Sequence, residues 1–285
     1  MRLDIVHPQF NTVSGAFDDL RDYLHHSVLS CGVESTVYRD SWPADGIPLF
    51  LGYSQLPAAV ELKPCIIYQT EVINDTADGH VSGKAAALAM LRKATAVWDF
   101  DADNVAALAA EGIRAQHVPV GYHPAMQRYE QAAVKDIDFF FYGCINKRRA
   151  RIFEKLAGYG KRVEVRGVQN GLYGKERDAL IAHTKVLPYP YFYDTGHVFG
   201  AVRPGYLLNN GSLVVVEDSE SLRRVWPDHP VQAEPYDELV GALMDTVDRS
   251  AVERSNMADE GAHWWQARPM APHVERAIRS TPCLS

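Results

Sequence analysis

The sequence has no run of 18 apolar residues and no closely spaced pair of cysteines. A transmembrane helix needs about 20 consecutive apolar residues, so we expect no membrane span. The four cysteines lie far apart, without a CxxC or CxxH pair, which argues against a zinc site and a disulfide framework. The opening MRLDIVHPQF lacks the basic, apolar and cleavage segments of a signal peptide. These absences together predict a reduced, cytoplasmic chain.

Positive charge is also scarce. Lysine and arginine number 29 against 36 acidic residues, which gives a formal net charge of −7 and a pI of about 5.9. Proteins that hold duplex nucleic acid by counterion release usually carry a basic excess. The balance therefore counts against DNA as a partner, but a local basic rim at Arg92, Lys93, Arg114 and Arg128 would still fit it.

The common catalytic signatures are missing as well. The sequence contains no GxSxG, Walker A, HExxH or GxGxxG pattern, so hydrolase, kinase, zincin and simple dinucleotide-binding functions have no support. Hydrophobic residues make up 47% of the chain and charged residues 23%, which is typical of a globular protein.

What the sequence does contain is an alternation of strands and helices. Short apolar runs such as LDIVHP alternate with helical segments over residues 1–125, and Asp101 is placed to cap the helix ADNVAALAAEG. A polar stretch at 123–136 interrupts the pattern, which restarts over residues 136–260. We therefore predict an α/β fold of two Rossmann-like domains facing one cleft, followed by a last short helix, APHVERAIRS. Ligands of such sheets bind where strands end, which nominates the loops at 9–15, 69–80, 143–148 and 194–203.

The loop FYGCINKRR is the strongest local signal. A strand runs into Gly143 and Asn146, and a helix then starts with Lys147, Arg148 and Arg149. Cations at a helix N-terminus oppose the helix dipole, so a bound anion such as a diphosphate would stabilise them. A solvated charge run is the alternative.

A second signal lies in FGAVRPGYLLNNGSLVVVED. Arg203 stands near a helix start, where its guanidinium could hold phosphate oxygens, although an ordinary surface cation is the alternative. Glu217 ends an apolar strand, where a carboxylate could accept a ribose or sugar hydroxyl.

Four residues are candidates for the chemical step. His7 and Glu71 lie near the ends of strands, and Asp194 and His197 lie in the loop DTGHVFG. Activation of an acceptor hydroxyl would need a general base, for which His7, Glu71 or Asp194 could serve. Glu71 could equally be a structural carboxylate.

Several blocks together resemble a bacterial and viral family of GT-B glycosyltransferases, group 1-like and related to the CgeB-type proteins. The blocks are CIIYQTEVI, VWDFDADNVAALAAEGI with HVPVGYHP, DFFFYGCINKRRARIFEKL, KERDALIAHTKVLPYPYF and VRPGYLLNNGSLVVVED. They follow the family's order over roughly residues 60–255. The resemblance implies transfer of a sugar from a nucleotide-diphosphate sugar, such as a UDP-sugar, to a glycan or small-molecule hydroxyl. It implies no obligatory metal and no other cofactor.

The resemblance also implies site residues. The donor would be held mainly by the C-terminal domain and the acceptor by the N-terminal domain, with residues 261–285 packing back on the N-terminal domain. An inverting transfer would use one of the three bases named above, whereas a retaining transfer needs no strong external base. The residues implied at the donor are Gly15, Gly143, Asn146, Lys147, Arg148, Lys185, Arg203 and Glu217.

One departure from the family pattern affects the donor sugar. Related retaining enzymes begin the helix that carries Arg203 with E-x-x-R, but this chain has Gly200 in place of the glutamate. Three explanations stay open: the sugar is recognised differently, with Asp194 or His197 as substitutes; another carboxylate serves; or catalysis is lost. The competing functions are a glycosyltransferase for modified bases in DNA and a non-catalytic GT-B binding module.

Overall fold

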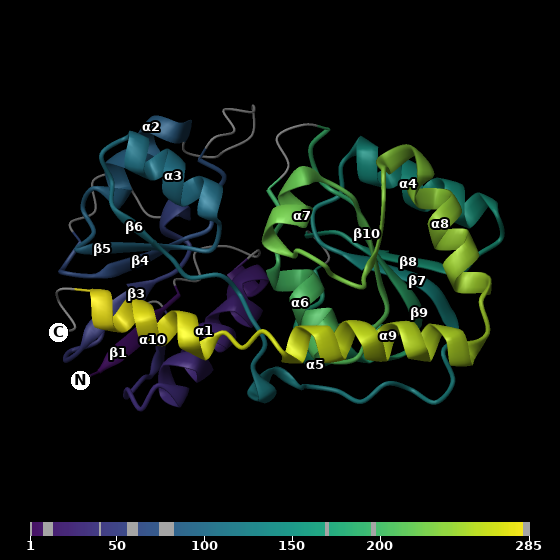
Figure 1. The fold of residues 1–285 in the computed structure, drawn as a ribbon, viewed down its shortest axis with the longest axis horizontal. Coiled ribbons are helices and arrows are strands. Elements are labelled where there is room, and N and C mark those ends of the chain that lie inside the picture. Colours follow the sequence, from purple (N-terminus) through teal and green to yellow (C-terminus); the bar gives the residue numbers. More distant parts are fainter. Residues whose placement is uncertain are drawn as a thin grey trace. The chain divides into compact units, whose positions relative to one another are not determined.

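The chain folds into two compact units (Figure 1), the first formed by Met1–His123 and Pro269–Ser285 and the second by Pro124–Arg268. In this computed structural model, the described residues are 2–7, 14–39, 41–55, 62–73, 83–168, 171–194 and 198–281. Each unit has its own parallel sheet, which confirms the predicted α/β class with two Rossmann-like domains. The polar stretch that we expected to link the domains lies, from Pro124 onward, within the second unit.

The first unit contains a six-stranded sheet in the order β2-β1-β3-β4-β5-β6, with every neighbouring pair parallel. Its elements are β1 (Leu3–Val6), η1 (Ser14–Phe17), α1 (Asp18–Ser30), β2 (Val37–Tyr38), β3 (Ile47–Phe50), η2 (Tyr53–Gln55), β4 (Ile66–Gln69), α2 (Gly83–Leu91), β5 (Ala96–Asp99), α3 (Ala102–Ala110), β6 (Ala115–His117) and α10 (Ala271–Ser280). β1 and β4 are buried along their whole length, as expected of parallel strands covered on both faces. The predicted cap is confirmed, because the Asp101 carboxylate accepts hydrogen bonds from the amides of Asp103 and Asn104.

The second unit contains a five-stranded parallel sheet in the order β11-β10-β9-β7-β8. Its elements are η3 (Pro124–Met126), β7 (Ile137–Tyr142), α4 (Lys147–Gly158), β8 (Val163–Arg166), α5 (Gly174–Ala182), β9 (Thr184–Tyr189), α6 (Val202–Asn209), β10 (Val214–Glu217), α7 (Glu220–Val225), β11 (Gln232–Glu234), α8 (Tyr236–Asp248) and α9 (Ala251–Gln266). Phe139 and Phe141 of β7 pack against Ile152, Phe153 and Leu156 of α4 in its core.

The two last helices belong to different units. α9 begins with a capping box formed by Ser250 and Glu253, and it packs against α6, where Gly205 leaves room for the ring of Trp265. α10 lies beside α1 in the first unit, where Thr281 accepts hydrogen bonds from the Trp98 indole and the Gln116 amide. The C-terminal segment that belongs to the first unit thus starts near Pro269, and not at residue 261 as predicted.

No helix in the described part of the chain combines the length and the apolar character that crossing a membrane requires.

Candidate functional site

The parallel strands of the second unit all end at one edge of its sheet, where three loops carry the predicted donor residues. β7 runs into Gly143, β9 into Pro190, and β10 ends at Glu217. Loops at the carboxyl ends of parallel strands form the ligand sites of open α/β sheets. We refer to this region as the carboxyl edge of the second unit.

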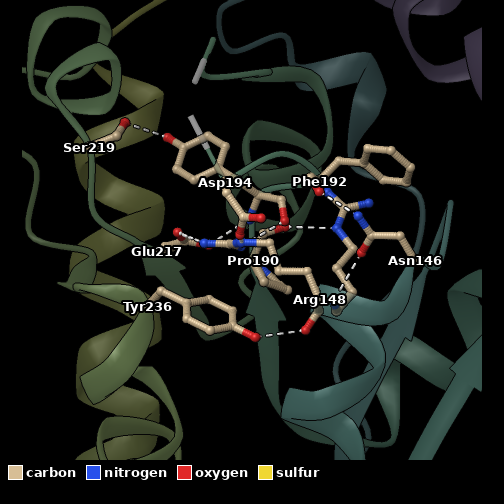
Figure 2. A network of polar contacts seen from close by, with 10 residues as sticks. Asn146, Arg148, Pro190, Phe192, Asp194, Glu217, Ser219 and Tyr236 are labelled. Atoms are coloured by element: carbon tan, nitrogen blue, oxygen red, sulfur yellow. Dashed lines mark hydrogen bonds and ion pairs between the residues drawn. The ribbon is translucent and has the colours of Figure 1, made fainter. Parts of the chain in front are cut away.

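Arg148 is the centre of a buried polar network at this edge (Figure 2). Its guanidinium forms a two-pronged ion pair with Glu217 and donates hydrogen bonds to Asp194, at 2.6 Å, and to the carbonyl of Tyr191, at 2.9 Å. The ring of Tyr236 lies 3.8 Å from the guanidinium carbon, and its hydroxyl donates to the Arg148 carbonyl. The donors of Arg148 are thus engaged within the protein.

This network changes the predicted role of Glu217 but not that of Asp194. Glu217, expected to accept a ribose or sugar hydroxyl, is only 2% exposed and accepts hydrogen bonds from Arg148 and from the amide of Tyr191. Its carboxylate therefore fixes Arg148 and does not face a ligand. Asp194 remains accessible, because its side chain is 85% exposed although it pairs with Arg148.

Arg149 is a buried cation that no carboxylate neutralises among the residues that the structure describes. It donates hydrogen bonds to the carbonyls of Pro190, at 3.0 Å, and Cys144, at 2.8 Å, and so fixes the loop that follows Gly143. Burial and the nearby charge of Arg203 lower the pKa of Arg149 to about 10. The two guanidinium groups therefore lie close enough to repel each other.

Arg203 is the most conspicuous group of this edge. Its guanidinium carbon lies over the rings of Phe141, Tyr142 and Tyr189, at 5.0, 5.1 and 5.6 Å from their centroids. Its Nη1 atom is buried and has no hydrogen-bond partner among the described residues. Gly143 adopts a φ of 132°, and a β-carbon there would collide with the Arg203 guanidinium. The absence of a side chain at 143 thus allows the arginine to lie against the backbone of the loop.

The charges at the carboxyl edge do not balance. Both nearby carboxylates, Glu217 and Asp194, pair with Arg148, which leaves Arg149 and Arg203 without an acidic partner in the described part of the chain. Buried charges are costly unless they are paired. An anion in contact with the Arg203 guanidinium would accept a hydrogen bond from its unpaired Nη1 atom. It would also reduce the repulsion between the two arginines.

The remaining predicted donor residues fall into two groups. Asn146 caps α4 by accepting a hydrogen bond from the Arg149 amide and also donates to the carbonyl of Phe192, whereas Lys147 is exposed at the helix start. Lys185 does not belong to this edge. It is the second residue of β9, at the amino edge of the sheet, where it pairs with Asp138 at 2.7 Å. It cannot contribute to the phosphate site predicted around Gly143.

In the first unit, Glu71 follows β4 at the carboxyl edge of that sheet. Its carboxylate accepts a hydrogen bond from the Ser54 hydroxyl at 2.9 Å, and its carbonyl accepts one each from the amides of Gln69 and Asn104. The side chain is partly exposed. The Glu71 carboxylate is therefore fixed by its hydrogen bonds and is still exposed enough for a ligand at this edge to contact it.

A buried acid supports the backbone around Glu71. The carboxylate of Asp99 accepts hydrogen bonds from the same two amides, of Gln69 and Asn104, and from the main chain of Asp101. Burial raises the pKa of Asp99 to about 7. Sequence reasoning did not single out Asp99, although its place at the end of a buried strand was a usable signal.

His7, the other first-unit candidate for the chemical step, is less accessible than Glu71. His7 is fully buried, its Nδ1 atom lies 3.8 Å from the carboxylate of Asp18, and its ring contacts that of Phe17. Burial raises the pKa of Asp18. Gly15 lies in the short helix η1 between β1 and α1. His197 lies outside the described residues, so its predicted role is not addressed.

Gly200 has a specific neighbour. The hydroxyl of Tyr189 donates a hydrogen bond to the Gly200 carbonyl at 3.0 Å, and a β-carbon at position 200 would lie only 3.1 Å from that hydroxyl oxygen. Position 200, where the family pattern named in the sequence analysis would place a glutamate, is therefore crowded by Tyr189.

Comparisons with solved structures show what this architecture is. Sucrose-phosphate synthase from Thermosynechococcus elongatus matches with a TM-score of 0.62 and 12% identity over 100% of both chains. T4 phage BGT in complex with UDP and Mn2+ matches with a TM-score of 0.58 and 12% identity, and Anabaena Alr3699/HepE in complex with UDP and glucose with 0.61 and 10%, each over 99% of both chains. This chain has the GT-B fold. No family model and no curated protein sequence matches it.

The burial pattern of α4 shows which residue the sequence interpretation undervalued. Arg149 was the third cation of a run whose first two members were assigned to the phosphates. Arg149, Ile152, Phe153 and Leu156 are all buried on α4. Their spacing of three and four places them on one helix face, so helical periodicity alone indicated that Arg149 points inward.

No group of three or more His, Cys, Asp or Glu side chains that could hold a metal ion occurs within the described ranges.

Proposed function

We propose that this chain is a glycosyltransferase that moves a sugar from a nucleotide-diphosphate sugar to a hydroxyl acceptor. The observation that carries the proposal is the buried Nη1 donor of Arg203 beside Gly143, which has no hydrogen-bond partner among the described residues, with Arg149 as a second cation that lacks an acidic partner there. The fold supports it, because T4 phage BGT and Anabaena HepE share the architecture and are described with UDP or UDP-glucose. A diphosphate would supply the negative charge that these two arginines lack.

The chemistry needs stabilisation of the leaving diphosphate. Negative charge builds on its oxygens as the bond to the sugar breaks, and fixed cations stabilise that charge without reorganising. Arg203 is held over three aromatic rings, and Arg149 is held by two carbonyls. Lys147, which is exposed at the start of α4, adds a mobile cation. We assign these three residues to the diphosphate.

The acceptor side is assigned to the first unit. A general base must reach the acceptor hydroxyl, and Glu71 is partly exposed while His7 is fully buried. Glu71 is therefore our choice for the base of an inverting reaction. Asp194, exposed beside Arg148, is our choice for a contact to the donor sugar, with His197 as the alternative. A retaining reaction would leave Glu71 as an acceptor-binding group.

The test is binding and turnover with a matched pair of variants. Thermal stabilisation is measured with a panel of nucleoside diphosphates and their sugars, for the unmodified chain, Arg203→Ala and Lys185→Ala. We expect one nucleotide to stabilise the chain, Arg203→Ala to abolish the shift, and Lys185→Ala, at the opposite edge, to retain it. Release of nucleoside diphosphate is then followed with candidate acceptors. Equal shifts in all three proteins would place the donor elsewhere, and the absence of any shift would contradict the function.

A glycosyltransferase for modified bases in DNA is the second candidate. Its support is the similarity to the DNA-modifying β-glucosyltransferase, with a TM-score of 0.54 over 99% of both chains. The net charge of −7 opposes it. The basic rim expected on the acceptor domain is also smaller than predicted, because Arg128 belongs to the second unit. Retention on DNA that carries hydroxylated bases at moderate salt, followed by sugar transfer to it, would favour this function.

A non-catalytic GT-B binding module is the third possibility, motivated by Gly200. Stabilisation by a nucleotide sugar without turnover on any acceptor would support it. The relation to CgeB-type proteins, the independence from metal and the cytoplasmic location remain predictions, which sequence relatives, chelator treatment and cell fractionation would test.

A further inference from the structure

A cavity of about 520 Å³ lies at the amino edge of the second unit's sheet, away from the Gly143 loop. Its walls come from the segment at 131–135, the starts of β9 and β10, and the first turns of α9. Cavities of a few hundred Å³ are of the size that holds a small metabolite. All strands of the sheet are parallel, so this edge is the opposite of the one that carries Arg203.

Three cations from three different elements line this cavity: Lys135, Lys185 and Arg254. Lys185 is neutralised by Asp138. Lys135 is not, because its ammonium donates to the side-chain carbonyl of Gln131, at 2.6 Å. Arg254 donates to main-chain carbonyls, including that of Val247 at 2.8 Å. No carboxylate in the described part of the chain pairs with Lys135 or Arg254.

The two unpaired cations influence each other. Burial, together with the charge of Arg254, lowers the pKa of Lys135 to about 8. The other charged groups that line or border the cavity are Asp259, exposed on α9, and the Lys185–Asp138 pair. A group with two negative charges would attract both free cations at once, which a neutral ligand cannot do.

The cavity is preformed and has an apolar side. Gln131, which positions Lys135, donates hydrogen bonds to the Asn210 carbonyl at 2.7 Å and to the Ser212 hydroxyl at 2.9 Å. The side chain of Asn210 in turn accepts a hydrogen bond from the Arg128 amide and donates one to the Met126 carbonyl, just before the segment at 131–135. Small apolar residues complete the lining, among them Val134, which is 75% exposed. A ligand with a carbon skeleton as well as an anionic group would use both features.

We propose that this cavity is a second anion site, which binds a small phosphorylated metabolite with its phosphate between Lys135 and Arg254. The phosphate replaces water around the two cations, and the carbon skeleton lies against Val134 and Ala258. Binding to the dianion favours the charged form of Lys135, so the site takes up a proton on binding near pH 8. The site does not depend on the proposed transferase function, because no group of the Gly143 loop contributes to it.

The test is isothermal titration calorimetry with phenyl phosphate, whose phosphate is fully ionised at pH 8, in two buffers of different ionisation enthalpy. We expect binding with uptake of about half a proton per ligand at pH 8. Lys135→Gln and Arg254→Gln should each weaken binding at least about tenfold, as expected for loss of a charge-assisted hydrogen bond. Lys155→Gln, on the exposed side of α4, is the matched control and should bind as the unmodified chain does.

Two further variants distinguish binding at this cavity from binding at the Gly143 loop. Lys135→Arg keeps a permanent charge, so it should bind phenyl phosphate without taking up a proton, an outcome that mere loss of folding cannot produce. Arg203→Ala removes any binding of phenyl phosphate at the Gly143 loop and should leave unchanged the affinity and proton uptake of the binding event that depends on Lys135. Loss of binding in Arg203→Ala with retention in Lys135→Gln would assign the anion to the Gly143 loop and overturn the proposal. Failure of the unmodified chain to bind would overturn it as well.

Discussion

Gly143 and Arg203 offer a direct test of the phosphate site, because the structure ties one to the other. Gly143→Ala places a methyl group where the Arg203 guanidinium lies, so the arginine must move. Loss of one charge-assisted hydrogen bond to a diphosphate costs about 1.5–3 kcal/mol, or about 10–150-fold in affinity. We expect Arg203→Ala and Gly143→Ala each to lose this amount, and the double variant to lose no more than either alone.

The assay is calorimetric titration of the nucleoside diphosphate that stabilises the unmodified chain best, carried out on all four members of the cycle. Gly143 also has a φ of 132°, so alanine there strains the backbone by about 1–3 kcal/mol, which lowers stability whatever happens to affinity. Gly160→Ala controls for this effect, because Gly160 has a φ of 76° and open space around its α-carbon. It should lower stability and leave affinity unchanged. Additive losses in the double variant would refute the link between the loop and Arg203.

Three further predictions concern stability. Arg148→Ala should lower the free energy of unfolding by about 3–5 kcal/mol in urea titrations, because it leaves the Glu217 carboxylate buried and unpaired; an effect below 1 kcal/mol would contradict this role. The pKa of Asp99 is raised to about 7 in the native state, whereas an aspartate in the unfolded state has a pKa near 4. Between pH 4 and 7 the native state therefore keeps a proton on Asp99 that the unfolded state has released. Stability relative to Asp99→Asn should therefore fall as pH rises from 4 to 7, by up to about 1.4 kcal/mol per pH unit, and stay constant above pH 7; a flat difference in urea titrations across that range would be incompatible with the assignment. Gly200→Glu should lower the melting temperature through about 1–3 kcal/mol of overpacking, and adding Tyr189→Phe should recover part of the loss; no recovery would show that Tyr189 is not the obstacle.

The fold was accessible from the sequence because its signals are local. Alternating apolar strands and amphipathic helices predict two parallel α/β domains, and the Asp101 cap and the helix at 271–280 follow from short patterns. α9 (Ala251–Gln266) is harder to predict from the sequence, because its apolar residues form no continuous stripe. Its capping box, formed by Ser250 and Glu253, was a usable start signal.

The candidate site was accessible only in part, because pairing between charges is a tertiary property. The sequence indicated that cations gather near Gly143. It did not indicate that Glu217, 69 residues from Arg148, pairs with Arg148 and not with Lys147 or Arg149. Which arginine stays available for a ligand depends on that choice. The position of Lys185, in contrast, could have been deduced, since a residue at the start of a parallel strand lies at the edge opposite the ligand loops.

Gly200 and Arg203 are connected through one tyrosine. The hydroxyl of Tyr189 bonds the Gly200 carbonyl, while its ring is one of the three aromatic faces that lie near the Arg203 guanidinium. A side chain at position 200 would press on that hydroxyl and thereby on the ring. Within this arrangement a glycine keeps the tyrosine, and with it the arginine, in place. The glycine at position 200 is thus compatible with the proposed phosphate site, and in the proposed transferase the donor sugar would then be recognised by groups other than the residue at position 200.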